Sequence, residues 1–153
     1  MSRSALVPTP SFRQWVSLAV VLLVGCASHP YSSAIRLEGA QEVPPVTTLA
    51  KGKGEITVLP DHIVSGSIKV SGVVATAAHI HIAATGKNGP VIITLVKKSD
   101  DTFDVPAGAK LNNAQYAAYQ AGNLYVNVHS AAHPGGEVRA QIKPAPPPES
   151  SKK

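Results

Sequence analysis

This chain of 153 residues has little cysteine, few charged residues and only short apolar segments. Because Cys26 is the only cysteine, no internal disulfide can form. Charged residues make up 15% of the chain, and its net charge of +5 is spread thinly among acidic residues, which argues against the clustered footprint of a nucleic-acid-binding protein. There is no glycine-rich nucleotide motif and no βαβ alternation, which excludes a nucleotide-binding α/β fold. What is left is one domain, in which 44% apolar residues can form a core.

The longest apolar segment, WVSLAVVLLV at residues 15–24, is too short for a transmembrane helix, which takes about 20 residues. It follows a stretch with two arginines and no acidic residue, and it ends in LVGC at residues 23–26. This order is typical of a secretory signal. The last four residues resemble the lipobox of bacterial lipoproteins, in which small residues precede a lipid-modified cysteine. We therefore expect residues 1–25 to be a lipoprotein signal peptide and Cys26 to carry a lipid.

The alternative is an ordinary secretory signal followed by an unmodified cysteine. Under the lipoprotein interpretation the chain is held at a membrane in the cell envelope. Ala27 stands where an Asp would favour retention in the inner membrane, so the resemblance implies the outer membrane, on its periplasmic side. We expect residues 26–33 to be a tether and residues 145–153, rich in proline and charge, to be a disordered tail.

Residues 34–144 are punctuated by turn residues, with β-branched runs between them. This spacing predicts strands at 34–43, 53–59, 62–70, 77–83, 91–97, 103–105, 123–130 and 136–143. Residues 112–121 carry the one helical pattern, with an Asn cap at the start and Gly122 at the end. We therefore predict an all-β domain, an antiparallel, Greek-key-like β-sandwich with one short helix.

Histidines are the strongest chemical signal in the sequence. His79 and His81 lie two apart on one predicted strand, so their side chains emerge on the same face. His129 ends a strand in which Val126 and Val128 are expected to point inward, while Tyr125 and Asn127 point outward with His129. His133 follows in the next loop. If the two strands are neighbours, His79, His81, His129 and His133 could bind one copper or zinc ion, since neutral imidazole suits both metals.

The alternative is that these histidines hydrogen-bond to loops and to each other without a metal. We expect the other two, His29 in the tether and His62 in a hairpin turn, to be solvated.

Three segments resemble the CHRD domain, first described in chordin and common in secreted bacterial proteins. They are LEGAQEVPPV (37–46), AAHIHIAATGKNGPVIITL (77–95) and NLYVNVHSAAHPGGEVRAQI (123–142). The positions that match the family pattern are His79, His81, Asn127, His129, His133, Gly135, Gly136, Glu137 and Arg139. The function of the family is poorly defined. In chordin the domains belong to an extracellular protein that binds growth factors, which implies a binding module.

The most specific of these segments also has a plain structural interpretation. Pro134-Gly135-Gly136 forms a turn between two strands, which gives a β-hairpin over about residues 123–143. Glu137 and Arg139 then lie on the same face, where we expect a surface ion pair worth at most about 1 kcal/mol.

Three functions remain for comparison. The first is a non-catalytic envelope module that binds a protein or surface partner, and the second is a periplasmic copper- or zinc-binding protein. The third is an enzyme similar to copper–zinc superoxide dismutase, but the bridging histidine, the zinc aspartate and the disulfide of that family have no counterpart here. Nor does the sequence hold a serine nucleophile elbow, a Cys–His pair or a readable pair of catalytic carboxylates. We therefore expect a protein that is not an enzyme.

The lipid anchor can be tested by replacing Cys26 with Ser. The variant lacks the thiol that accepts the lipid, so it should leave the membrane fraction for the soluble fraction on cell fractionation. If the variant stays membrane-bound, and unprocessed wild-type chain is the main species, the apolar run is an uncleaved anchor instead.

Overall fold

The computed structural model describes residues 31–145 of the chain. The expected signal peptide, Cys26, residues 27–30 of the expected tether, His29 among them, and residues 146–153 of the expected tail lie outside the described residues. Across residues 31–145, no helix has both the length and the apolar character needed to cross a membrane.

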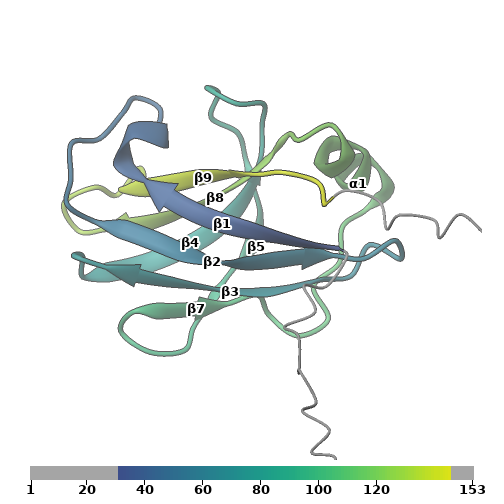
Figure 1. The fold of residues 1–153 in the computed structure, drawn as a ribbon, viewed down its shortest axis with the longest axis horizontal. Helices are drawn as coiled ribbons and strands as arrows, with labels where there is room; N and C mark the ends of the chain where they lie inside the picture. The colour runs from purple at the N-terminus through teal and green to yellow at the C-terminus, as the bar shows by residue number, and fades with distance from the viewer. Residues whose placement is uncertain (1–30, 146–153) are drawn as a thin grey trace, which may run out of the picture.

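Nine strands, one α-helix and one short 3₁₀ helix follow each other along the described chain (Figure 1). They are β1 (Ser32–Glu38), the 3₁₀ helix (Gly39–Gln41), β2 (Lys51–Val58), β3 (Val64–Ser71), β4 (Ala75–Ile82), β5 (Val91–Thr94), β6 (Val96–Lys97), β7 (Thr102–Asp104), α1 (Asn113–Gln120), β8 (Leu124–Ser130) and β9 (Val138–Ile142).

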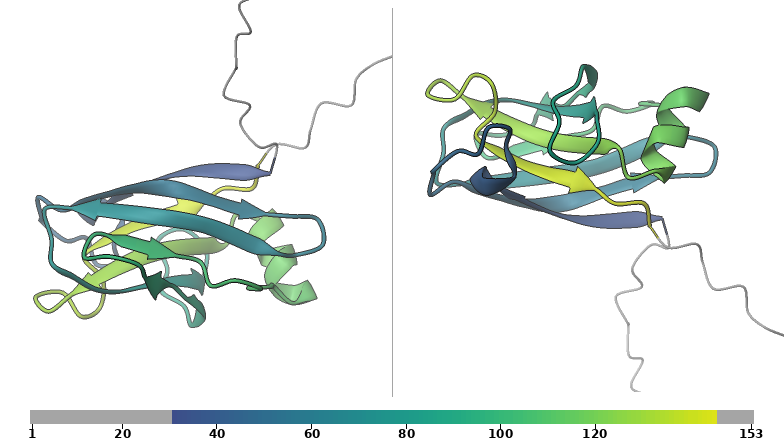
Figure 2. Two further views of the ribbon diagram at one scale, coloured as in Figure 1. Left: turned by 90° about the horizontal axis from the view of Figure 1, so that it is seen from below. Right: turned by 90° about the horizontal axis from the view of Figure 1, so that it is seen from above.

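All pairs of neighbouring strands are antiparallel, in the order β5-β4-β8-β9-β1-β2-β3-β7-β6. The first and last strands of this order, β5 and β6, follow each other in the chain with only Leu95 between them. The sheet therefore nearly closes on itself, and its two layers are visible edge-on in Figure 2. The last strand lies beside the first, as in a Greek key. The prediction of an all-β antiparallel sandwich is confirmed.

Alternating apolar residues of the strands fill the space between the layers. The side chains that are at most 2% exposed there include Ile35, Leu37, Ile56, Ile68, Ile80, Phe103, Leu124, Val126, Val128, Val138 and Ile142. The inward direction expected for Val126 and Val128 is confirmed, because both are 0% exposed. Burial of this apolar surface is the main term that stabilises the fold.

Three predicted strands differ most from the sequence pattern, and the last of them, predicted over 136–143, is only Val138–Ile142. The first begins at Ser32, inside the expected tether, and ends at Glu38, because Gly39 starts the 3₁₀ turn and its carbonyl accepts the backbone N–H groups of Glu42 and Val46. The strand predicted over 91–97 is two strands, because the chain pairs with β4 up to Thr94 and with β7 from Val96 onward. The first difference comes from a local turn and the second from a change of partner strand, and a two-residue periodicity reveals neither.

The predicted helix is present as α1, and its start has the expected chemistry. The side chain of Asn112 accepts the backbone N–H of Gln115, and the side chain of Gln115 accepts the backbone N–H of Asn112, which is a capping box. The helix ends before Gly122, whose φ of 72° is the left-handed conformation that favours glycine.

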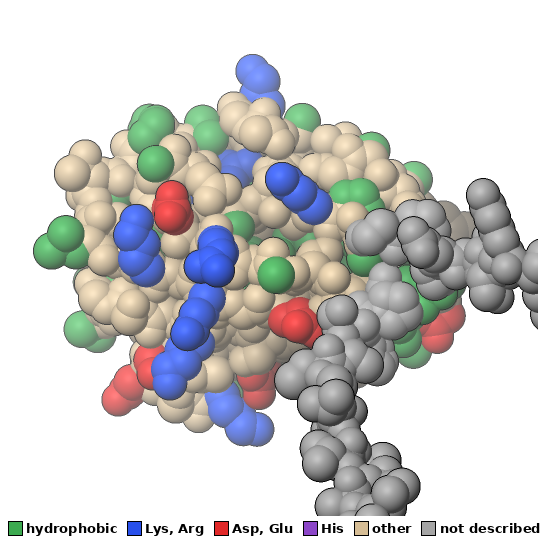
Figure 3. Space-filling view, in the orientation of Figure 1, with side chains coloured by type: hydrophobic (Ala, Val, Ile, Leu, Met, Phe, Trp, Pro, Cys, Tyr) green, Lys and Arg blue, Asp and Glu red, His purple; other side chains and the backbone are tan. Residues whose placement is uncertain are grey.

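The outer face of β1, β2 and β3 is charged. Arg36, Lys53 and Lys69 are direct neighbours in the strand register, and Lys and Arg side chains form a band over this face in Figure 3. Lys69 pairs with Asp101 at 3.1 Å. At the edge of the same layer the two described ends of the chain meet, because the hydroxyl of Ser33 donates to the carbonyl of Lys143.

Gly54 in β2 is a position where the sheet has no room for a side chain. A Cβ at residue 54 would lie 2.0 Å from the carbonyl oxygen of Ser67 in β3. We expect Gly54→Ala to lower the free energy of unfolding by more than about 2 kcal/mol, because the backbone pairing would have to move. Chemical denaturation measures this loss. Gly135→Ala is the control, since a Cβ there meets no atom within 4 Å and should change stability by less than about 0.5 kcal/mol. Equal losses in both variants would contradict this account.

Candidate functional site

The outward face of β4, β8 and β9 carries polar side chains that are not exposed. The register aligns His79 with Asn127 and Arg139, and it aligns His81 with Tyr125 and Gln141. Tyr125 and Asn127 point away from the core, as expected, but each is only 2% exposed. The sandwich therefore has a second buried layer outside its sheet. We call this the polar layer, and its members are Glu42, His79, His81, Tyr125, Asn127, His129 and Arg139.

The loop from Ala83 to Pro90, which joins β4 to β5, covers the polar layer. The carbonyl of Gly89 accepts a hydrogen bond from Nδ1 of His81 at 2.9 Å, and its N–H donates to the hydroxyl of Tyr125 at 3.3 Å. Arg139 donates to the side-chain oxygen of Asn88 at 3.1 Å and to the carbonyl of Lys87 at 2.9 Å. These bonds hold the loop against the strands, so the layer is closed by backbone groups of the loop.

The segment after β1 also covers the polar layer, and it places Glu42 inside this layer. Glu42 is 5% exposed, and its Oε1 has no hydrogen-bond partner. Burial raises the pKa of Glu42 to about 7, although the charge of Arg139 and a hydrogen bond from Asn127 act against this rise. A Cβ on Gly136 would lie 2.4 Å from Oε1 of Glu42, so only glycine leaves room for the carboxyl group. The amide of Asn88 donates to the carbonyl of Val43 at 2.7 Å and ties the two covers together.

The ring of Tyr125 is stacked between a cation and an imidazole. The guanidinium carbon of Arg139 lies 3.4 Å from the centroid of the Tyr125 ring. The ring of His81 stacks on Tyr125 with a centroid distance of 4.6 Å and an interplanar angle of 5°. Since both partners cannot occupy one face of the ring, Tyr125 lies between them. This stack fixes the plane of His81.

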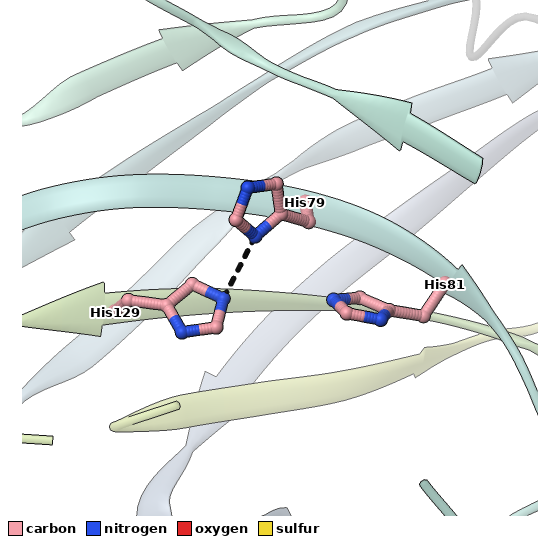
Figure 4. A group of neighbouring side chains, drawn as sticks. All are labelled: His79, His81 and His129. Carbon is pink, nitrogen blue, oxygen red and sulfur yellow. Dashed lines mark hydrogen bonds between the residues drawn. The ribbon is translucent and has the colours of Figure 1, made fainter. Parts of the chain in front are cut away.

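His79, His81 and His129 converge at the edge of the polar layer and form the histidine cluster (Figure 4). One nitrogen of each ring lies within 4.8 Å of the others. Nδ1 of His79 is 2.8 Å from Nε2 of His129, and Nδ1 of His129 is 2.9 Å from the carbonyl of Pro134. The cluster combines the hydrogen bonds expected without a metal with the convergence expected of a metal site.

The surroundings of His79 and His129 favour the neutral form of each imidazole. Burial lowers the pKa of His79, and the nearby His129 and His81 lower it further. Burial also lowers the pKa of His129, against a smaller opposite effect of its hydrogen bond to Pro134. Neutral imidazole is the form that binds a metal ion.

The fourth predicted ligand, His133, does not join the histidine cluster. It lies in the turn before β9, where its charge acts on Glu137. Burial alone would raise the pKa of Glu137, but hydrogen bonds from Ser130 and Thr48 and the charge of His133 lower it. His62, the fifth histidine among the described residues, is half-buried, and its ring stacks on that of Tyr116 with a centroid distance of 4.0 Å, so its expected solvation is wrong.

The surface ion pair expected between Glu137 and Arg139 is also wrong. The two residues are 7% and 1% exposed, respectively. Glu137 accepts a hydrogen bond from the hydroxyl of Thr48 at 2.7 Å, while Arg139 is held by the β4–β5 loop and Tyr125. A two-residue spacing placed them on a common face, but loops from elsewhere in the chain bury that face.

Sequence reasoning missed Glu42, Asn88, Gly89 and Tyr125 as parts of the site. The first three lie in loops, which have no periodicity to mark them. Their only signal was their place inside segments that matched a family pattern, at 37–46 and 77–95. In the fold, these segments and the third, at 123–142, meet at the polar layer.

The described residues thus form an all-β domain, a nearly closed antiparallel sandwich with a buried polar layer beneath two loops. The chain belongs to the CHRD domain family, whose pattern matches residues 34–142. No curated protein and no solved structure matches the chain significantly.

Glu42 should make the stability of the domain fall as pH rises. Its pKa of about 7 in the folded chain is above the value of 4.5 for an unperturbed carboxyl. Its stabilising contribution is therefore complete below pH 4.5, and ionisation removes it as pH rises from 4.5 through about 7. We expect Glu42→Gln to raise the free energy of unfolding at pH 8 by up to about 3 kcal/mol relative to wild type, and by much less at pH 4.

Denaturant titrations at several pH values measure this difference. Glu55→Gln, at an exposed position in β2, is the matched control and should give no such pH-dependent gain. A gain for Glu42→Gln that is the same at pH 4 and pH 8 would contradict the buried-carboxyl account.

Proposed function

We propose that this CHRD-domain chain is a non-catalytic binding module of the cell envelope, anchored to a membrane by a lipid on Cys26. The observation that carries the proposal is the LVGC sequence at residues 23–26, close before the matched domain at 34–142. Ala27 supports a position on the periplasmic side of the outer membrane. The partners are the membrane, through the lipid, and a protein or surface ligand.

Metal binding is the second candidate function, and one specific observation favours it. The histidine cluster gathers three ring nitrogens within 4.8 Å of one another, from two strands that are far apart in the sequence. Copper and zinc both favour imidazole ligands. The two candidates are compatible, since a lipid-anchored module can hold an ion as its ligand.

A superoxide dismutase activity is the third candidate, and it is the least supported. Copper–zinc chemistry of that kind needs a bridging histidine and a zinc aspartate, for which the sequence offers no residues. An assay of superoxide consumption by the copper-loaded protein tests it. We expect no activity above that of free copper, whereas a saturable activity lost in His129→Ala would overturn the non-catalytic proposal.

The metal-binding candidate is tested by titrating the purified protein with copper and zinc at pH 7.5 and pH 5.5. Binding should be weaker at the lower pH, because protons compete for the imidazoles. The His79→Ala/His81→Ala double variant should lose binding, since it removes two of the three converging nitrogens. His133→Ala should bind like wild type, because His133 lies outside the histidine cluster. Equal binding by wild type and double variant, or none by either, would leave the anchored-module proposal without a metal ligand.

A further inference from the structure

The hydrogen bonds of the histidine cluster determine which ring nitrogen carries each proton. A carbonyl oxygen can only accept, so Nδ1 of His81 must donate to Gly89 and Nδ1 of His129 must donate to Pro134. In the neutral rings, the lone pairs of His81 and His129 are therefore on Nε2. His79 then donates from Nδ1 to Nε2 of His129, at 2.8 Å.

Nε2 of His81 stands out because its lone pair is buried and has no partner. His81 is only 8% exposed, and its Nε2 takes part in no hydrogen bond. The nitrogen points toward the space beside His79 and His129 (Figure 4). A buried acceptor without a partner has an energetic cost, and a bound cation would remove it.

The carbonyls of Gly89 and Pro134 have the role that a hydrogen-bond acceptor commonly has beside a metal-binding histidine. A metal-binding histidine usually donates its other ring N–H to a carbonyl or carboxylate, which fixes the ring orientation. Gly89 and Pro134 provide this for His81 and His129, respectively. His81 also stacks on Tyr125, whose other face is covered by Arg139, and this stacking is a second constraint on the His81 ring. Two of the three donors are thus preorganised.

The donor set of the cluster favours copper over zinc. All three donors are imidazole nitrogens, and no carboxylate or thiolate joins them among residues 31–145. The buried guanidinium of Arg139, behind Tyr125, adds positive charge nearby. Because no anionic ligand balances the charge of the ion, the site disfavours a divalent ion. Monovalent copper carries half the charge and is disfavoured less. For divalent ions, nitrogen sites bind copper more tightly than zinc.

We infer that the histidine cluster binds copper through Nδ1 of His79 and Nε2 of both His81 and His129, so that the ion replaces the hydrogen bond between His79 and His129. The inference rests on the metal-binding candidate above and adds the donor atoms and the preferred metal. Donor nitrogens about 2.0–2.1 Å from one ion lie roughly 3.4 Å apart. The two nitrogens of His79 and His129 must therefore separate slightly from 2.8 Å, while a ring nitrogen of His81 already lies within 4.8 Å of both residues' donor nitrogens. The proton on Nδ1 of His79 moves to its Nε2, with no change in net charge.

Nitrogen-15 NMR of the histidine-labelled protein tests the donor atoms, because long-range couplings report which ring nitrogen carries the proton. Without metal, all three cluster histidines should carry it on Nδ1. With monovalent copper, which is diamagnetic, His79 should carry it on Nε2, while His81 and His129 keep theirs on Nδ1. If His79 keeps the Nδ1 proton in copper-loaded protein, the inference is overturned, although metal binding itself still stands.

Competition between metals tests the preference. Wild type and His133→Ala should bind copper at least roughly tenfold more tightly than zinc, measured against a chelator of known affinity. His79→Gln, at a half-buried position, should lose most of the copper affinity while retaining the fold by circular dichroism. Equal or tighter zinc binding overturns the copper assignment. No uptake of either metal, with the metal-free tautomers as described, refutes the metal-binding candidate itself.

Discussion

The guanidinium of Arg139 holds the outer side of this sandwich together. A fully buried arginine must have its donors paired and its charge stabilised, since an unpaired buried cation is very costly. Here the charge lies over the ring of Tyr125, and its N–H groups bond to Lys87 and Asn88 in the β4–β5 loop. The loop is thereby fixed over His81, and Asn88 extends the tie to the segment that carries Glu42. The polar layer and the histidine cluster both depend on this one buried charge.

Local patterns determined most of the fold. Alternation in β3 and the β-branched runs of β2, β4 and β8 predicted the strands, and the Asn112 cap with Gly122 predicted α1. Some strand ends were not predictable in this way. The chain changes its partner strand from β4 to β7 at Leu95, and β1 ends where the 3₁₀ turn begins at Gly39. Alternation of apolar and polar residues marks neither point.

For the site, strand alternation predicted correctly that His79, His81 and His129 share a face, and the pairing of β4 with β8 brings them together. It could not show that this face is buried, because the cover comes from loops. The same omission made Glu137 and Arg139 look like a surface pair. The segments that resemble the family include the missing loop residues, but the sequence pattern does not show where these residues lie in space. Only the fold explains why a glutamate at 42 and a glycine at 136 belong to one cluster.

The meeting of the two described chain ends has a mechanical consequence. A pull on the chain ahead of Ser32 enters β1 along its length. The seven residue pairs that join β1 to β2 then share the load in shear, rather than opening one after another as they would under a force applied across the strand. The hydroxyl of Ser33 passes part of the same load to the carbonyl of Lys143, just beyond β9. The β1–β2 ladder is thus placed so that its residue pairs would share a force entering from the N-terminal side.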